Sequence, residues 1–372
     1  MSRPDLAILV ATSGHSGVDT LFRNLAAEIH GRGHALQVLR VDGHGPAWES
    51  VLPAHLIVRL GAAHVDTSLL PLVRYLRRER PRALLTDKDR VNRMAVIARR
   101  LAGVDTRLVI RIGTTFSRNL EGRRRLHRLG QHLSARHLYP RADVIVVPSR
   151  GAAADLVATA SIPASKVKAL PSPVITARVL AQAREMPAHP WLRDKTRPVF
   201  LGAGELCARK DFATLIRAFA ALRRRREARL IILGEGRRRG ELEALVRELG
   251  VADDVDLPGF TANPYGFMAN ADVFVLSSRW EGLGNVLVEA LALGMRCVAT
   301  DCPSGPREVL EDGRYGALVP VGDVDALARS MAAALDEHHD TGQAAAATRR
   351  YGVAAATDGY LQVLGLAPAG GP

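Results

Sequence analysis

Residues 277–294, SSRWEGLGNVLVEALALG, follow the apolar run DVFVL at 272–276, and this stretch decides the expected fold. The apolar run predicts a buried strand, and Gly282, Gly284 and Asn285 predict a turn that leads into a helix continuing past Glu289. Such a turn directs free backbone N–H groups and the positive end of the helix toward whatever lies above the strand. That arrangement favours a phosphate group.

Two carboxylates lie in this segment, Glu281 and Glu289, with seven residues between them. Carboxylates accept hydrogen bonds, so they suit sugar hydroxyls better than phosphate oxygens. A nucleotide sugar offers both kinds of group. The alternative interpretation is that Glu281 caps the helix and Glu289 is a surface residue.

Short apolar runs alternate with amphipathic helical patterns along the whole chain, which indicates parallel sheets of the βαβ kind. We therefore expect an α/β protein with two doubly wound, Rossmann-like domains whose sheets face an interdomain cleft, with ligands beyond the carboxyl ends of the strands. Four prolines at 171–190 mark a break between the two series. The expected boundaries are an acceptor-binding domain at 1–172, a linker at 173–195, a nucleotide-sugar domain at 196–352, and a C-terminal helix and tail at 353–372 that crosses back to the first domain.

The formal net charge of +13 is unevenly spread. Residues 1–190 contain 29 Lys+Arg and 14 Asp+Glu, whereas residues 191–372 contain 22 and 24. The excess forms two clusters: Arg74, Arg77, Arg78, Arg80 and Arg82; and Arg123, Arg124, Arg125, His127, Arg128, Arg136 and His137. An anionic partner of the first domain is therefore expected.

The stretch LLPLVRYLRRERPR at 69–82 interleaves leucines and arginines at helical spacing. A helix with an apolar stripe and a cationic face suits an anionic membrane surface. The alternatives are a solvated face of a core-packed helix and, third, a nucleic-acid surface. Aromatic residues make up only 5% of the chain, so stacking platforms for bases are scarce and no nucleic-acid partner is expected.

No apolar run approaches the ~20 residues of a membrane-spanning helix, and LAILVA at 6–11 is shorter than a signal-peptide core of ~7–15 residues. The three cysteines, Cys207, Cys297 and Cys302, have neither metal-ligand spacing nor a disulfide pattern. We expect a cytoplasmic protein, peripheral on the inner face of the cell membrane.

The sequence resembles the retaining glycosyltransferases of family 4, which have the two-domain GT-B fold, and the resemblance is strongest in the second half. The resemblance covers most of the chain and rests on an ordered series of motifs. These are GAGELCARKDFATLIRAFA at 202–220, LIILGEG at 230–236, VDLPGF at 255–260, the segment at 272–294 and TDCPSGPREVLEDGRYGALVPVGD at 300–323.

The resemblance implies roles for individual residues. Glu289 would hold the ribose hydroxyls and Glu281 the donor sugar, while Lys210 and Arg209 would neutralise the leaving diphosphate. The remaining donor-binding residues would lie near the phosphates, sugar and base: Gly282, Leu283, Gly284, Asn285, Gly234, Gly236, Gly259, Phe260 and, from SGHSGVDT in the first domain, Gly14 and Gly17.

Two departures from the family pattern matter. Glu205 stands where the family commonly has an arginine, so one diphosphate cation is absent. The usual histidine after the fourth strand is also missing from RLVIRIGTTFSRN at 107–119, which leaves Arg111 or Thr114 to contact the sugar. His15, in the glycine-rich loop, is a further candidate for substrate contact.

Asp87-Lys88-Asp89 has the spacing of a metal-binding Asp-x-Asp motif, but that motif belongs to a different glycosyltransferase fold. We expect no metal and no cofactor other than a nucleotide sugar, most simply a UDP-sugar. The expected function is retaining transfer of a hexose to a lipid-linked glycan or a glycerolipid. The alternatives are a nucleotide-sugar epimerase of the same fold and a non-catalytic nucleotide-sugar-binding protein.

Overall fold

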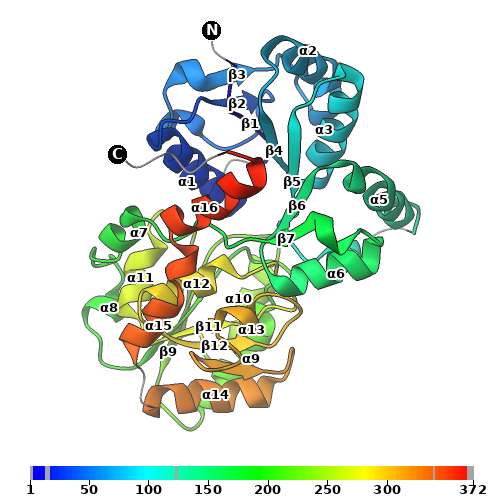
Figure 1. The fold of residues 1–372 in the computed structure, drawn as a ribbon. Coiled ribbons are helices and arrows are strands. Elements are labelled where there is room, and N and C mark those ends of the chain that lie inside the picture. The colour runs from blue at the N-terminus through cyan, green and yellow to red at the C-terminus, as the bar shows by residue number, and fades with distance from the viewer. Residues whose placement is uncertain (1–2, 13–16, 122–124, 338–339, 367–372) are drawn as a thin grey trace. The chain divides into compact units, whose positions relative to one another are not determined.

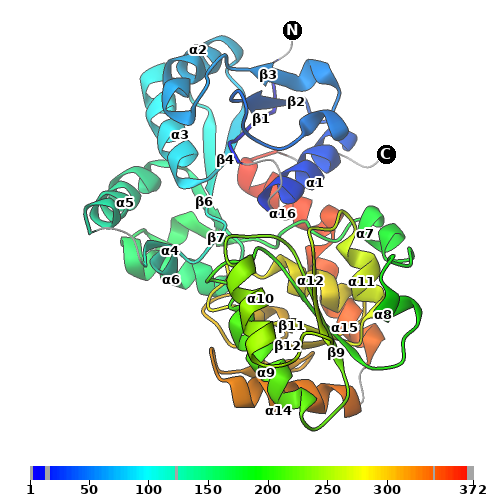
Figure 2. The same ribbon diagram turned by 180° about the vertical axis from the view of Figure 1, so that it is seen from behind.

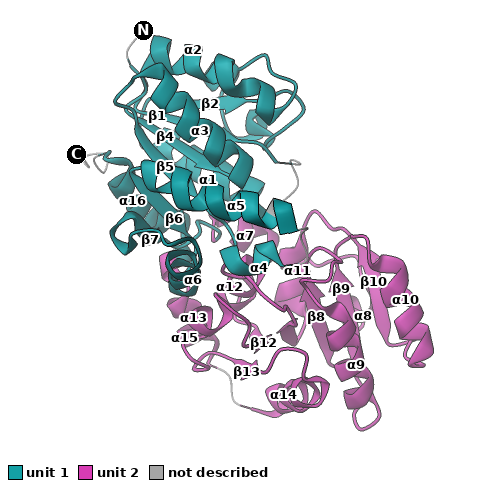
Figure 3. Cartoon of the chain, turned by 90° about the vertical axis from the view of Figure 1, so that its right-hand side faces the viewer, with its two compact units in different colours: residues 1–174, 351–372 teal, residues 175–350 magenta. Residues whose placement is uncertain are grey.

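The structure, a computed structural model, describes residues 3–12, 17–121, 125–337 and 340–366. It divides into two compact units, one formed by residues 1–174 with 351–372 and the other by residues 175–350 (Figure 3). Unit 1 contains 27 Lys+Arg and 14 Asp+Glu, and unit 2 contains 24 of each, so the whole net charge of +13 belongs to unit 1.

Unit 1 is built on a sheet of seven parallel strands in the order β3-β2-β1-β4-β5-β6-β7. The order reverses between β1 and β4, where Leu6 of β1 pairs with Leu36 of β2 on one side and Ala83 of β4 on the other. The strands are β1 (Leu6–Val10), β2 (Leu36–Arg40), β3 (Ile57–Arg59), β4 (Ala83–Asp87), β5 (Arg107–Arg111), β6 (Val144–Val147) and β7 (Val167–Ala169).

Helices cover both faces of this sheet and bury a hydrophobic cluster on each (Figures 1 and 2). One cluster includes side chains of α2, α3 and α6, and the other includes side chains of α1 and α16. The helices are α1 (Gly17–Gly31), α2 (Leu69–Glu79), α3 (Asp89–Ala102), α4 (Phe116–Leu120), α5 (Arg125–Leu138), α6 (Arg150–Ala160) and α16 (Val353–Leu364). The C-terminal helix is thus part of unit 1.

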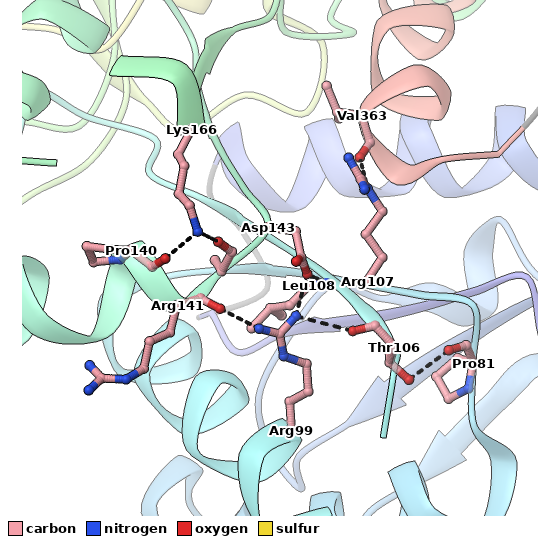
Figure 4. A network of polar contacts seen from close by, with 11 residues as sticks. Pro81, Arg99, Thr106, Arg107, Leu108, Pro140, Arg141, Asp143, Lys166 and Val363 are labelled. Atoms are coloured by element: carbon pink, nitrogen blue, oxygen red, sulfur yellow. Dashed lines mark hydrogen bonds and ion pairs between the residues drawn. The ribbon is translucent and has the colours of Figure 1, made fainter. Parts of the chain in front are cut away.

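Polar contacts hold together the amino-terminal ends of β5, β6 and β7 (Figure 4). Arg99 forms an ion pair with Asp143 and donates to the backbone oxygens of the neighbouring loops. Arg107 Nε donates to the Val363 oxygen at 2.7 Å and so fastens the end of α16 to β5. Part of the arginine excess of unit 1 therefore has a structural use.

Unit 2 contains six parallel strands in the order β10-β9-β8-β11-β12-β13. The strands are β8 (Val199–Ala203), β9 (Arg229–Leu233), β10 (Val255–Gly259), β11 (Val273–Leu276), β12 (Arg296–Thr300) and β13 (Ala317–Val319). The helices are α7 (Ala177–Gln182), α8 (Pro190–Arg193), α9 (Phe212–Arg223), α10 (Arg239–Glu248), α11 (Pro264–Asn270), α12 (Asn285–Ala292), α13 (Pro306–Val309), α14 (Val324–Asp336) and α15 (Thr341–Ala347). Side chains of α9, α10 and α14 form one core with the sheet. Two doubly wound parallel sheets confirm the expected fold class.

The structure assigns most of the segment expected as a linker to unit 2, because the division falls between Val174 and Ile175. Asn263, which caps α11, donates to the Gln182 oxygen at 2.9 Å and to the Glu185 carboxylate at 2.9 Å. This segment is therefore packed against the rest of unit 2 and is not a free linker. One of its prolines, Pro190, is the first residue of the short helix α8.

The helix expected at 69–82 forms as α2, but its apolar stripe faces the core. Leu72, Val73 and Leu76 are buried against α3 and the sheet, while Arg74 and Arg78 are exposed. The core-packed alternative is therefore correct for this helix. Within the residues that the structure describes, no helix has the length and apolar character needed to cross a membrane.

Candidate active site

The predicted site residues of unit 2 gather at the carboxyl edge of its sheet, where the strand order reverses between β8 and β11. The loop after β8 carries Arg209 and Lys210, and the loop after β11 carries Glu281. Neighbouring strands of a parallel sheet end at the same edge, so residues about 70 positions apart in sequence become neighbours. This is the place where open α/β sheets hold their ligands.

Glu281 is held at both carboxylate oxygens by cations. Lys210 Nζ lies 2.7 Å from Oε1, and Arg209 Nη1 lies 2.8 Å from Oε2. The Ser278 hydroxyl donates to Oε1 at 2.8 Å. Glu281 and Lys210 are 6% and 7% exposed, so their ion pair is almost completely removed from water. Two cations and one carboxylate leave a net charge of +1 at this point.

The charge state of Glu281 follows from these partners. Burial by itself raises the pKa of a carboxyl, but the charges of Lys210 and Arg209 and the bonds from Lys210 and Ser278 outweigh it. The pKa of Glu281 therefore lies below its usual value, and the side chain is a carboxylate at neutral pH. An ammonium has three donors and a guanidinium five, so both cations retain N–H groups for an anionic ligand.

Glycine at position 204 allows the Lys210 side chain to lie across the backbone. Its φ is +152°, and an added Cβ would lie only 2.8 Å from Lys210 Cε. The backbone oxygen of Lys210 also accepts a 2.9 Å bond from the Ser277 hydroxyl on the other loop. The two loops are thus joined by backbone and side-chain contacts, which positions the ammonium group. Glu205, next to this glycine, is exposed.

Glu289 lies on α12, eight residues after Glu281, and accepts a 3.3 Å bond from the Tyr265 hydroxyl of α11. The side chain keeps some accessible surface, yet the surrounding protein raises its pKa to about 7 despite the opposing effects of Tyr265 and Lys210. Glu281 and Glu289 therefore differ in charge near neutral pH: the first is ionised and the second titrates there.

The turn between β11 and α12 forms as expected. Gly284 precedes α12 with φ +86°, a left-handed conformation that glycine adopts without strain. Leu283 is buried at 2% exposure, so its side chain packs inside the unit, whereas Asn285, the first residue of the helix, is partly exposed. The positive end of the α12 dipole is at its N-terminus, next to this turn.

Three glycines predicted to border the base have a packing role that the sequence did not suggest. An added Cβ at Gly234 would lie 2.0 Å from the Gly204 oxygen, and one at Gly236 would lie 2.4 Å from the Leu206 oxygen. The amide of Gly234 also donates to the Gly259 oxygen at 2.8 Å. These glycines allow neighbouring loops to approach closely at the site edge. Phe260, which follows, is 71% exposed and presents an aromatic ring at that edge.

The described site candidates of unit 1, Gly17, Arg111 and Thr114, lie at or beyond the carboxyl ends of its strands. Gly14 and His15 fall outside the described residues, and Gly17 is the exposed first residue of α1. Arg111, at the end of β5, is 3% exposed; its guanidinium lies 2.5 Å from Asp87 and 3.2 Å from the Tyr360 hydroxyl. Arg111 is therefore occupied inside unit 1, and Thr114 is the more accessible of the two candidates.

The two carboxylates of the Asp-x-Asp stretch have separate partners. Asp87 forms an ion pair with Arg111. Asp89 forms an ion pair with Arg93 at 2.8 Å and accepts a 2.6 Å hydrogen bond from the Tyr139 hydroxyl. Among the described parts of the chain, no group of three or more His, Cys, Asp or Glu side chains is arranged to hold a metal ion.

Two side chains at the site were not predicted, Ser278 and Tyr265. Ser278 lies three residues before Glu281 within a turn, a spacing at which a hydroxyl commonly reaches a nearby acceptor, so the sequence contained a weak signal for it. Tyr265 is 24 residues from Glu289, on another helix, and only the packing of α11 against α12 reveals the contact.

Two family models match the chain in succession. Residues 16–173 match the model described as "Glycosyl transferase 4-like domain", and residues 187–351 match "Glycosyl transferases group 1". The chain belongs to the GT-B glycosyltransferases. Its two matched regions agree with the two compact units of the structure.

This glycosyltransferase has relatives of named function. It is 36% identical, over 67% of its length and 66% of the relative, to the N-acetylgalactosamine-N,N'-diacetylbacillosaminyl-diphospho-undecaprenol 4-alpha-N-acetylgalactosaminyltransferase of Campylobacter jejuni. It is 34% identical, over 46% of its length and 51% of the relative, to the lipopolysaccharide core biosynthesis glycosyltransferase LpsE of Rhizobium meliloti. The chain thus spans from about half to just under two thirds of the length of these two relatives.

Solved structures share the fold. HepE from Anabaena, in complex with UDP, has a TM-score of 0.77 at 19% identity and covers 97% of this chain and 99% of its own. The apo form of the lipopolysaccharide outer core galactosyltransferase WaaB has a TM-score of 0.72 at 19% identity and covers 96% and 98%. At this identity, the likeness concerns the fold.

Proposed function

We propose that the protein transfers a hexose, with retention of configuration and without a metal ion, from a UDP-sugar to a lipid-linked glycan. The observation that carries this proposal is the cluster at the strand reversal of unit 2. There a buried carboxylate, Glu281, is held by Lys210 and Arg209 beside the start of α12.

The cluster suits the leaving group of such a reaction. As the bond between the sugar C1 and the diphosphate oxygen breaks, negative charge grows on the diphosphate, and preorganised cations and backbone amides stabilise it. Lys210 and Arg209 would supply the cations, and the turn at Gly282–Asn285 the amides. A new bond joins C1 to the acceptor oxygen on the same face, and the acceptor proton passes to the departing diphosphate. No separate protein base is then required.

The two glutamates would divide the donor between them. Glu281, an ionised carboxylate, would accept hydrogen bonds from the sugar hydroxyls, and Glu289 would accept them from the ribose. Because burial raises the pKa of Glu289 to about 7, ribose binding through this carboxylate would strengthen as pH rises through neutrality. The exposed ring of Phe260 would border the base.

The acceptor follows from the charge of unit 1 and from the relatives. All of the chain's net charge of +13 belongs to unit 1, which suits an anionic, membrane-borne diphosphate acceptor. The Campylobacter relative is named for a diphospho-undecaprenol-linked substrate, which supports a polyprenyl-diphosphate glycan; a glycerolipid is the second candidate. Peripheral attachment at the cytoplasmic face of the membrane belongs to the same proposal.

A donor screen followed by a transfer assay tests the proposal. UDP-sugars are expected to raise the melting temperature more than GDP-sugars, because a ligand that binds only the folded state stabilises it. The preferred donor should then glycosylate a polyprenyl-diphosphate acceptor, and EDTA should not stop the reaction. NMR of the product should show the same anomeric configuration as in the donor. Turnover of the UDP-sugar to an isomer without acceptor would favour the epimerase. Binding without any turnover would favour a non-catalytic protein, for which the absence of a cation at Glu205 is the best argument.

A further inference from the structure

Three exposed leucines lie on one side of α5. Leu126, Leu129 and Leu133 are 85%, 54% and 45% exposed. At about 100° per residue, their Cα positions fall within an arc of about 60°. The other exposed leucines of the described chain, Leu70, Leu101 and Leu180, lie on three different helices. A contiguous apolar strip of this kind is typical of an interaction site rather than of ordinary surface.

The opposite side of α5 attaches the helix to unit 1. Ala135 is completely buried and Gln131 is 8% exposed, and both lie about 120–180° around the helix from the leucines. Gln131 Nε2 donates to Asp89 at 3.3 Å, and the Tyr139 hydroxyl, just after the helix, donates to the same carboxylate at 2.6 Å. These contacts orient α5 against α3 and α6 (Figures 1 and 3). The three leucines lie on its exposed side.

The leucine strip is bordered by cations. Arg125 and Arg136 are exposed on α5 and lie within about 40° of the leucine arc, whereas the exposed Arg128 lies on the other side of the helix, near Ala135. The sequence 125–138 contains no Asp or Glu. Apolar side chains flanked by arginines complement an anionic lipid surface, where acyl chains accept the former and phosphates the latter. By contrast, α2 buries Leu72, Val73 and Leu76 and exposes one leucine, Leu70, beside its arginines.

We propose that α5 is the element by which the protein docks on anionic membranes, with Leu126, Leu129 and Leu133 inserted at the headgroup boundary and the arginines on lipid phosphates. The proposal rests on the proposed function, because it identifies the surface that brings unit 1 to its lipid-borne acceptor. It replaces the sequence-based assignment of this role to residues 69–82. Arg123 and Arg124 of the second basic cluster lie outside the described residues.

The test uses the variant Leu126→Gln/Leu129→Gln/Leu133→Gln, because glutamine and leucine have similar helix propensities. Its matched control is Leu70→Gln/Leu101→Gln/Leu180→Gln, which makes the same change at exposed leucines on three other helices. Binding is measured by co-sedimentation with vesicles of phosphatidylcholine and phosphatidylglycerol in equal parts. We expect the α5 variant to lose at least about tenfold in partition coefficient and the control to stay within about twofold.

The charge contribution is tested separately with Arg136→Gln, which lies beside the leucine strip and should weaken vesicle binding about fivefold at low salt, since one interfacial arginine contributes about 1 kcal/mol. That difference should shrink at about 1 M salt, where the Debye length is about 3 Å. Equal binding of the wild type to pure phosphatidylcholine, or equal binding of the α5 variant and the wild type, would overturn the proposal. If the wild type is a dimer and the α5 variant is a monomer with unchanged vesicle binding, the strip is an interface between copies of the chain.

A thermal shift with UDP separates this inference from the proposed function. Both leucine variants should keep the wild-type shift, which also shows that they are folded. Loss of the shift in every form of the protein, with vesicle binding intact, would reject nucleotide-sugar transfer and leave the docking surface standing. The reverse result, a UDP shift and acceptor turnover in detergent without vesicle binding, would reject the docking surface alone.

Discussion

Replacement of Lys210 by methionine tests whether the cation cluster is held together by charge. The substitution keeps an unbranched side chain and removes the ammonium group that lies 2.7 Å from Glu281. Arg209 and Ser278 remain, but the carboxylate stays buried with one of its two cations lost. Removing one partner of a buried ion pair costs about 3–5 kcal/mol when the remaining charge is left without compensation, and because Arg209 still pairs with Glu281 we expect a loss at the lower end, about 3 kcal/mol.

The expected loss in melting temperature follows from the size of the unit. Unit 2 spans residues 175–350, and for a domain of this size 1 kcal/mol corresponds to about 2–4 °C. Lys210→Met should therefore melt roughly 10 °C below the wild type at pH 7.5, as measured by circular dichroism. Lys195→Met is the matched control: its ammonium also lies 2.7 Å from a carboxylate, that of Asp272, but the pair is partly exposed. Its cost should be within about 1 kcal/mol.

The pH dependence of the loss identifies its cause. The pKa of Glu281 is depressed in the folded wild type, so its stabilising contribution is present above the unfolded pKa and disappears as pH falls through the folded pKa. Without Lys210 the pKa of Glu281 rises, so the variant's deficit should be largest at neutral pH and smaller near pH 4.5. Glu281→Gln/Lys210→Met should recover most of the stability and none of the transfer activity. Equal stability of Lys210→Met and wild type at pH 7.5, or a deficit independent of pH, would refute the reasoning.

Two further substitutions probe the other buried charges. The pKa of Glu289 is raised to about 7, so the folded state binds a proton that the unfolded state has released, and wild-type stability should fall by about 3 kcal/mol as pH rises from about 4.5 to 7. In Glu289→Gln, urea unfolding should show no such fall in stability with pH. A pH dependence identical to that of the wild type would contradict the assignment. Arg111→Met leaves the Asp87 carboxylate buried and should destabilise unit 1 by about 3–5 kcal/mol in hydrogen-exchange measurements, whereas the exposed Arg82→Met should have an effect below about 1 kcal/mol. Similar exchange rates in the two arginine variants would show that the Arg111–Asp87 pair is not a source of stability.

The sequence was most informative where strands are long and buried. The runs at 6–10, 199–203 and 273–276 are apolar throughout, the run at 83–87 begins with three apolar residues, and each forms a buried central strand. The edge strands β3, β7 and β13 were not predicted. Each has three residues, and the pairing that stabilises such a short strand comes from its neighbour in the sheet rather than from its own sequence.

The interpretation of amphipathic helices from sequence was less secure. Residues 69–79 and 125–138 both combine leucines with arginines, and the sequence pattern indicated only the first as a membrane helix. The structure buries Leu72 and Leu76 of the first helix and exposes Leu126, Leu129 and Leu133 of the second. Periodicity shows that a helix has an apolar side, but only the tertiary packing decides whether another element covers that side.

The sequence by itself determined that this chain forms two βαβ series and that its candidate site residues concentrate in the loops after residues 203 and 276. Both conclusions depend on local features, namely apolar runs, glycine turns and the order of motifs. Only the tertiary structure decided that Lys210 and Arg209 grip Glu281, that Tyr265 reaches Glu289, and that Arg111 is committed to Asp87. These partners are between 24 and 72 residues apart in the chain, and it is the parallel order of the strands that brings them within hydrogen-bond distance.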